Sequence, residues 1–187
     1  ESVNWTIGTT FNAGPVAVTI DYFNIDLTDR IALSSLIEID RTDPAQAAIL
    51  DMLNAAGVPG ATTLTAFQFF TNDFETTTQG IDFVATLPFS MAGGDSTLSL
   101  AVNWTDTKLE EITALADATR KMQLEDQLPE YRAVLTGTHA IGPWRFLARA
   151  SYYDSFISAL EIGADASGTF DGKYGAKTMF DVEAAYT

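Results

Sequence analysis

The 187-residue sequence predicts an all-β fold: an antiparallel up-and-down meander of about seven strands, with a short helix in a long loop. Three observations predict it. Seven segments alternate apolar and polar residues with a period of two, the pattern of strands that have one apolar face. The connections between these segments are alternately short and long. No run approaches the ~18 consecutive apolar residues that a membrane-spanning helix requires.

The composition narrows the possible functions. Hydrophobic residues make up 47% of the chain, which is too apolar for a disordered protein despite a formal net charge of −15. The 25 acidic residues outnumber the 10 basic ones, and this balance would repel the phosphates of nucleic acid. The sequence has no cysteine, which removes disulfides and thiolate metal sites.

The first four predicted strands lie before residue 105. The residues that share the mainly apolar face of each strand are Val3, Trp5, Ile7, Thr9 and Phe11; Val16, Val18, Ile20 and Tyr22; Ile81, Phe83, Ala85, Leu87 and Phe89; and Leu98, Leu100, Val102 and Trp104. In the second strand the apolar set then shifts to Phe23, Ile25 and Leu27. Such a change of phase indicates either a β-bulge or an exit from the apolar zone.

The last three predicted strands are less uniform. In the fifth, Tyr131 to Ala140, neither face is decisively apolar. The apolar positions of the other two are Trp144, Phe146, Ala148, Ala150 and Tyr152, and then Phe180, Val182, Ala184 and Tyr186. Ten residues at ~3.3 Å each, tilted, are enough to cross a bilayer.

The connection lengths carry the strongest information about the class of fold. Short links near 12–15, 90–95 and 141–143 alternate with long links near 34–64, 106–130 and 154–176. A β-sandwich has no reason to gather every long loop at one end. An outer-membrane barrel does, because its periplasmic turns are short and its extracellular loops are long. We therefore expect a partial segment of a large transmembrane β-barrel, with sequential strands paired as hairpins.

The first long link has the signals of a helix within 44–56. Asp43 suits the N-cap, Pro44 suits the first helical position, and Gly57 suits the C-terminal stop. We expect Ile49 or Leu53 to pack against neighbouring protein. A second, weaker helix is possible within 114–125.

Three sequence segments, in this order along the chain, resemble segments of the barrels of TonB-dependent outer-membrane receptors. They are IDYFNIDLTDRI at 20–31, FFTN at 69–72 followed by TQGID at 78–82, and LPEYRA at 128–133. Their order and spacing resemble the C-terminal part of those barrels, so the resemblance covers essentially the whole chain.

The resemblance implies a large monomeric barrel of about 22 strands, closed by a plug domain. Such receptors reside in the bacterial outer membrane, among lipid and lipopolysaccharide. They import scarce ligands, typically ferric siderophores, cobalamin or oligosaccharides, driven by the TonB complex. The chain begins and ends within strand-like sequence. We therefore expect residues 1–187 to be a β-barrel fragment whose plug and terminal strands lie outside it.

Arg145 and Arg149 are the candidate lumen-facing contacts for an anionic ligand or for the plug. The alternative is that they pair with Asp or Glu on neighbouring strands, as charges inside a barrel usually do. His139, the sole histidine, lies in a predicted strand without an acidic cluster at metal spacing, so we expect a structural role, and no metal or cofactor. No motif of a catalytic site is present, so we do not expect an enzyme.

Two alternative functions remain: a passive outer-membrane porin and a soluble β-sandwich binding module. In a barrel, one face should point to lipid, and the predicted set is Leu98, Leu100, Val102, Trp104, Trp144, Phe146, Phe180 and Val182. The predicted lumen set is Asn4, Thr6, Asp82, Asn103, Arg145, Arg149, Asp181 and Glu183. Aromatic residues at either end of the lipid face are expected to form girdles: Trp5, Phe89, Trp104, Trp144 and Tyr152. Alone in water, the fragment would bury its lipid face by self-association or by curling on itself.

Overall fold

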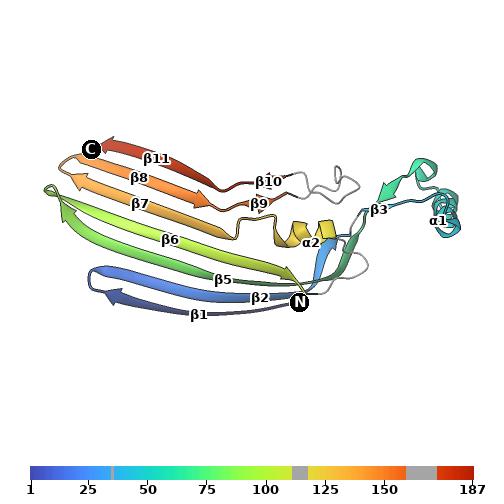
Figure 1. Cartoon of the computed structure of the whole chain (residues 1–187), viewed down its shortest axis with the longest axis horizontal. Coiled ribbons are helices and arrows are strands. Elements are labelled where there is room, and N and C mark those ends of the chain that lie inside the picture. The colour runs from blue at the N-terminus through green and yellow to red at the C-terminus, as the bar shows by residue number, and fades with distance from the viewer. Residues whose placement is uncertain (35, 111–117, 159–171) are drawn as a thin grey trace.

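The computed structural model describes residues 1–34, 36–110, 118–158 and 172–187. In these ranges seven long strands form one antiparallel sheet in the order β1-β2-β5-β6-β7-β8-β11 (Figure 1). Their bounds are β1 Ser2–Ala13, β2 Val16–Leu33, β5 Phe70–Met91, β6 Gly94–Leu109, β7 Tyr131–Ile141, β8 Trp144–Tyr153 and β11 Lys177–Tyr186. Each of these strands pairs with its neighbour in chain order, which confirms the predicted meander. The strands form a single layer, so the fold is not a sandwich.

Three hairpins close one end of the sheet, here called the turn end (Figure 1). Each has a two-residue turn, at 14–15, 92–93 and 142–143. Gly14 and Gly142 have φ of 63° and 54° and precede proline, the sign pattern of a type II′ turn. Ala92 and Gly93 have φ of 51° and 77°, the sign pattern of type I′. Both types match the right-handed twist of the flanking strands, which is why such short links suffice.

The described parts of the long connections lie at the opposite end, the loop end (Figure 1). Their elements are β3 Ile37–Glu38, α1 Pro44–Ala55, η1 Ala61–Thr63, β4 Ala66–Phe67, α2 Ala118–Glu125, β9 Phe156–Ile157 and β10 Lys173–Tyr174. Strand β3 pairs with β4, and β9 pairs with β10. Within the described ranges, neither helix has the length and hydropathy to cross a membrane.

Helix α1 confirms the prediction for 44–56. The Asp43 carboxylate accepts a hydrogen bond from the Ala45 amide at 2.9 Å, Pro44 begins the helix, and Gly57 follows it with a φ of 76°. The helix contacts η1, and Leu50 is the buried residue of the helix. Leu53 is only partly buried, which meets the expected packing in part, and Ile49 remains 47% exposed.

Asp40 fixes the chain just before this helix. Its carboxylate accepts hydrogen bonds from the Thr42 hydroxyl at 2.6 Å and the Thr42 amide at 2.8 Å. These two bonds hold the pKa of Asp40 below its ordinary value. Of the second predicted helix, 118–125 is confirmed as α2, and 114–117 lies outside the described residues.

The strands reach further toward the loop end than the apolar pattern indicated. Strand β5 has 22 residues, whereas the apolar alternation predicted only 81–89. The β2–β5 register runs unbroken from Ala17 opposite Thr86 to Leu27 opposite Thr76. The change of phase at Phe23 is therefore an exit from the apolar zone, and the bulge in β2 lies beyond Leu27.

The register separates the side chains into two faces, because antiparallel partners share a face and successive residues alternate. The apolar face holds the whole predicted lipid-facing set: Leu98, Leu100, Val102, Trp104, Trp144, Phe146, Phe180 and Val182. The polar face holds the whole predicted lumen set: Asn4, Thr6, Asp82, Asn103, Arg145, Arg149, Asp181 and Glu183. Side chains of the apolar face stay exposed in this single layer, as Phe180 at 77% and Val182 at 85% illustrate.

Aromatic residues gather at both ends of the apolar face. The row toward the loop end comprises Trp5, Tyr22, Trp104, Tyr131 and Tyr152, and the row toward the turn end comprises Phe11, Phe89, Trp144, Phe146 and Tyr186. Within them, the rings of Trp5 and Tyr22 lie 5.2 Å apart and those of Trp144 and Tyr186 lie 5.0 Å apart. On β8 the rows are eight residues apart, or ~26 Å along the strand. At the ~35–45° tilt of barrel strands this length spans a height of ~20 Å, close to the ~25 Å apolar band of outer-membrane barrels.

Candidate functional site

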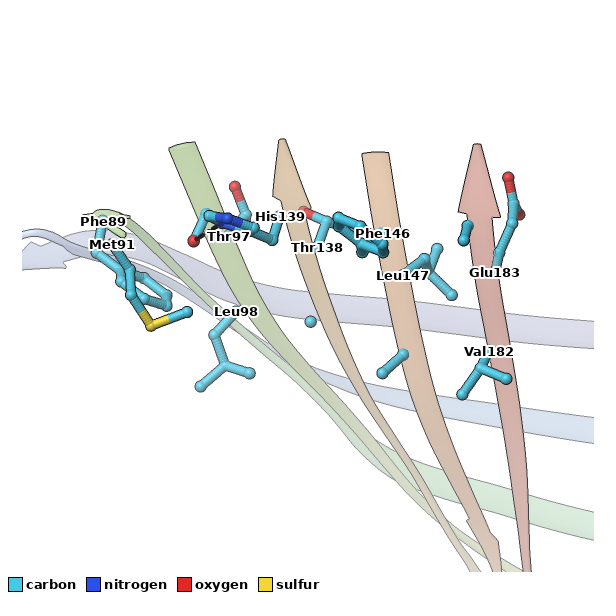
Figure 2. Close-up of a pocket in the computed structure, with 14 residues that line it drawn as sticks. Phe89, Met91, Thr97, Leu98, Thr138, His139, Phe146, Leu147, Val182 and Glu183 are labelled. Carbon is cyan, nitrogen blue, oxygen red and sulfur yellow. Dashed lines mark hydrogen bonds between the residues drawn. The ribbon is translucent and has the colours of Figure 1, made fainter. Parts of the chain in front are cut away.

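A hollow of about 510 Å³ lies near the turn end and is lined mainly by apolar side chains. Figure 2 shows Phe89 and Met91 on one side of it, Val182 and Glu183 on the other, and His139 between them. His139 Nδ1 is 2.8 Å from the Ser96 hydroxyl, a hydrogen bond between neighbouring strands that fits a structural role. An apolar hollow on the apolar face suits a hydrocarbon chain better than a polar ligand, so the candidate site for a polar ligand lies on the polar face.

The predicted residues Arg145 and Arg149 lie on the polar face of β8. Arg149 stands opposite Asp181 of β11 in the register, and Arg145 shares a hollow of about 410 Å³ with Asp95 and Glu183. Within the described part of the chain, neither guanidinium forms an ion pair. The structure thus brings the two arginines together on one strand with acidic residues beside them, an arrangement that suits both of the roles considered for them.

One polar row crosses the sheet closer to the loop end. Asp21, Asp82, Asn103 and Arg132 are successive partners in the register. Two carboxylates directly opposite each other repel. The repulsion is eased because the Asn103 amide donates to Asp82 at 2.8 Å, while the Asp21 carboxylate turns away over Gly8 on β1. Arg145 and Arg149 lie on the turn-end side of this row, and a second group of polar residues, which includes Asn103 and Arg132 of the row, extends toward the loop end.

That second group forms a trough of about 370 Å³ on the polar face, under α2. Its floor consists of Asn103, Thr105 and Thr107, which share the polar face of β6. Its roof consists of residues 123–125 of α2 and residues 127–129. Arg30 of β2 and Arg132 of β7 complete the lining. The trough has polar groups below, apolar Leu124, Leu128 and Pro129 in its roof, and a cation contributed from each side.

The roof is held in place by a small hydrophobic core. Leu124 of α2 packs against Phe74, which is 0% exposed, and Leu109. The Glu125 carboxylate accepts a hydrogen bond from the Leu109 amide at 2.8 Å and lies 3.9 Å from Lys121. These contacts join α2 to β5 and β6, so the trough is a fixed feature of the fold.

A one-residue bulge brings Arg30 into the trough. Up to Leu27 the odd-numbered residues of β2 lie on the polar face, so uninterrupted alternation would put Arg30 on the apolar face. Asp29, with a φ of 53°, adds one residue to β2 between the pairs Leu27–Thr76 and Arg30–Phe74. The extra residue reverses the alternation. Arg30 Nη1 accordingly donates to Thr76 Oγ1 at 3.5 Å on the polar face.

Sequence reasoning missed both arginines of the trough. Arg30 falls in a segment with no apolar alternation, and its face depends on the conformation of Asp29, for which the sequence gives no firm signal. Arg132 is the second residue of the strand whose faces were ambiguous. The one available signal for Arg132 was its place in the LPEYRA segment, directly after a long loop.

The described residues contain no group of three or more His, Asp or Glu side chains arranged to hold a metal ion. The candidate site is thus made of arginines, hydroxyls and amides, which bind ligands by hydrogen bonding and charge.

Comparison with known proteins places these features in a family. A search of curated proteins gives no match. A family model described as "TonB dependent receptor-like, beta-barrel" matches residues 1–187, the whole chain. The antiparallel meander, the loops at one end and the two opposite faces agree with that match. The chain belongs to the TonB-dependent receptor β-barrel family.

Proposed function

We propose that this chain forms part of the barrel wall of an outer-membrane receptor that imports a scarce ligand such as a ferric siderophore. The family supports an outer-membrane receptor-type barrel. The observation that carries the proposal is the division of one sheet into an apolar face with two aromatic rows and a polar face that bears arginine side chains. A barrel wall needs this division because one side meets hydrocarbon and the other meets water.

Each face then has a set of partners. The apolar face contacts outer-membrane lipid, and the loop end contacts lipopolysaccharide. The polar face lines the lumen, which in the parent receptor holds the plug that couples to TonB. Arg145 and Arg149 contact the plug or an anionic ligand, and the neighbouring Asp181 and Glu183 supply the complementary charges for a plug surface.

A passive porin is the alternative with the same outer surface. Porins need an open aqueous lumen. Here α2 and residues 127–129 cover part of the polar face and enclose a trough, which favours binding over free passage. The family match points the same way.

The test is uptake by cells that produce the full-length receptor. Cells with and without the gene are grown under iron limitation, and uptake of ⁵⁵Fe is measured from ferric complexes of catecholate, hydroxamate and citrate type. We expect uptake of at least one complex to require the gene, TonB and an energised inner membrane. Uptake that persists after dissipation of the proton gradient would instead identify a porin. If no iron complex depends on the gene, the siderophore assignment is wrong.

A further inference from the structure

We propose that the trough under α2 is a ligand subsite that recognises a hydroxylated polycarboxylate, with one arginine at each end. This inference rests on the proposed import function and names the chemistry of the imported ligand. Two sources share that chemistry: an acidic oligosaccharide, and an iron complex of a hydroxycarboxylic acid such as citrate.

The charge of the trough is the first argument. Among the described residues neither Arg30 nor Arg132 forms an ion pair. Of the described residues that line the trough, Glu125 is the one acid, and it is engaged by the Leu109 amide and by Lys121. The nearest other carboxylate in the register, Asp82, is held by Asn103 on the side away from Arg132. In a chain of net charge −15, two such guanidinium groups in one trough indicate an anionic ligand.

The spacing of the arginines is the second argument. Arg30 bonds to Thr76, which stands opposite Leu109, whereas Arg132 stands opposite Asn103. The Arg30 guanidinium therefore lies at a row six residues along β6 from the row of Arg132, about 20 Å away, and the Arg30 backbone, opposite Phe74, lies further away still. Only the Arg132 side chain shortens that gap. A single small anion cannot contact both. A ligand with carboxylates at separate positions can, and the planar guanidinium suits a carboxylate in two-point hydrogen bonding.

The lining between the arginines is the third argument. Thr107 Oγ1 lies 2.9 Å from Thr78 Oγ1, and Thr105 Oγ1 donates to Asn103 Oδ1 at 3.2 Å. Each hydroxyl keeps unused capacity to donate or accept, so the floor can bind ligand hydroxyls. Leu124, Leu128 and Pro129 offer an apolar surface above it. Hydroxyl-binding groups on one side and apolar contacts on the other fit a sugar ring or a hydroxycarboxylate backbone.

The test is direct binding by the purified full-length receptor in detergent, followed by tryptophan fluorescence or calorimetry. The probes are trigalacturonate and ferric citrate, with maltotriose as a neutral counterpart of the sugar. We expect one of the two polycarboxylates to bind, maltotriose to bind at least tenfold more weakly, and added salt to weaken the polycarboxylate. Preference for trigalacturonate identifies the oligosaccharide source, and preference for ferric citrate identifies the iron source.

Variants locate the binding. R30Q and R132Q should each weaken the bound polycarboxylate roughly tenfold to a hundredfold, because each removes one charge-assisted contact. K108Q is the matched control, because it makes the same charge change on β6, beside Thr107. Lys108 lies on the apolar face, where it pairs with Asp106 at 3.5 Å, so it does not line the trough. K108Q should leave affinity unchanged. Deletion of Asp29 removes the bulge and should reduce the affinity as much as R30Q does. If that deletion prevents assembly of the receptor, the affinity of R30Q alone tests the role of Arg30.

Three results overturn the proposal: binding of neither polycarboxylate, equal binding of maltotriose, or affinities of R30Q and R132Q that match K108Q. The proposed function fails separately. If the purified receptor binds a polycarboxylate through Arg30 and Arg132 but cells show no energised uptake, the subsite stands and the import function does not.

Discussion

The ring of Phe23 lies against Gly80, its direct partner in the β2–β5 ladder. A Cβ atom on Gly80 would meet both this ring and the backbone oxygen of Trp104 on β6. The backbone oxygen cannot turn aside as a side chain can. Gly80 is thus a position where three strands pack closely, and the aromatic ring of Phe23 covers the surface that a glycine leaves bare.

We therefore expect G80A to destabilise the receptor by about 1–3 kcal/mol, the usual cost of forcing an extra methyl group into a packed site. G137A is the matched control, because the nearest atom to a Cβ there is Leu98 Cδ1 at 3.9 Å, an ordinary contact. It should be neutral or slightly stabilising, by up to ~1 kcal/mol. Urea unfolding of the full-length receptor, followed by tryptophan fluorescence, measures both. Equal stability of the two variants would show that Gly80 is not tightly packed.

The β5–β6 turn contains a residue in an unfavourable conformation. Ala92 has a φ of 51°, in the left-handed region that residues with a Cβ rarely occupy. Asn tolerates this region and is common at this position of type I′ turns, so A92N should stabilise the receptor by roughly 0.5–1 kcal/mol. A92V should destabilise it, because a β-branched residue tolerates positive φ least. Unfolding midpoints in one detergent measure both changes, and a stabilising A92V would rule out the type I′ geometry.

The cap of α1 predicts a local effect rather than a global one. D43A removes the acceptor for the Ala45 amide and should reduce the stability of α1 by about 1 kcal/mol. Hydrogen exchange of the α1 amides should then quicken about fivefold, since 1 kcal/mol corresponds to that ratio. D51A makes the same charge change at an exposed position inside the helix and should not quicken exchange. An unchanged rate in D43A would mean that the cap does not limit the opening of this helix.

The parts of the fold that the sequence predicted are those where a single physical rule decides. Where only one face is apolar, as in 98–104, alternation fixes both the strand and the direction of its side chains. The cap, proline and glycine around α1 likewise agree on one helix. The strand extension 70–79 was missed because its threonines, asparagine and glutamine are polar on both faces, so no period of two stands out.

The candidate site was predictable only in part. Arg145 and Arg149 lie in a strand with clear alternation, so their face could be predicted. Arg30 could not be placed, because its face depends on one extra residue at Asp29 and on the partner strand that accepts it. The trough also needs α2 above β6, a contact between segments that have no shared pattern in the sequence. Bulges and loop packing are set by tertiary contacts, which a local pattern does not encode.

Adjacent residues on β6 give a direct test of the two faces. Leu100 stands opposite Ala85 and Leu135 on the apolar face, near the middle of the band between the aromatic rows, and Ala101 lies on the polar face. L100R would place a guanidinium in hydrocarbon and should destabilise the receptor in lipid by about 2–4 kcal/mol, the cost measured for Arg at the midplane of such barrels. A101R adds the same group one residue away, where it meets the aqueous lumen, and should cost far less. Unfolding in guanidinium, with the receptor in lipid vesicles, compares the two. A cost of A101R equal to or above that of L100R would mean that the faces have been assigned the wrong way round. It would also turn Arg30, Arg132, Arg145 and Arg149 toward lipid, which no barrel of this kind would tolerate.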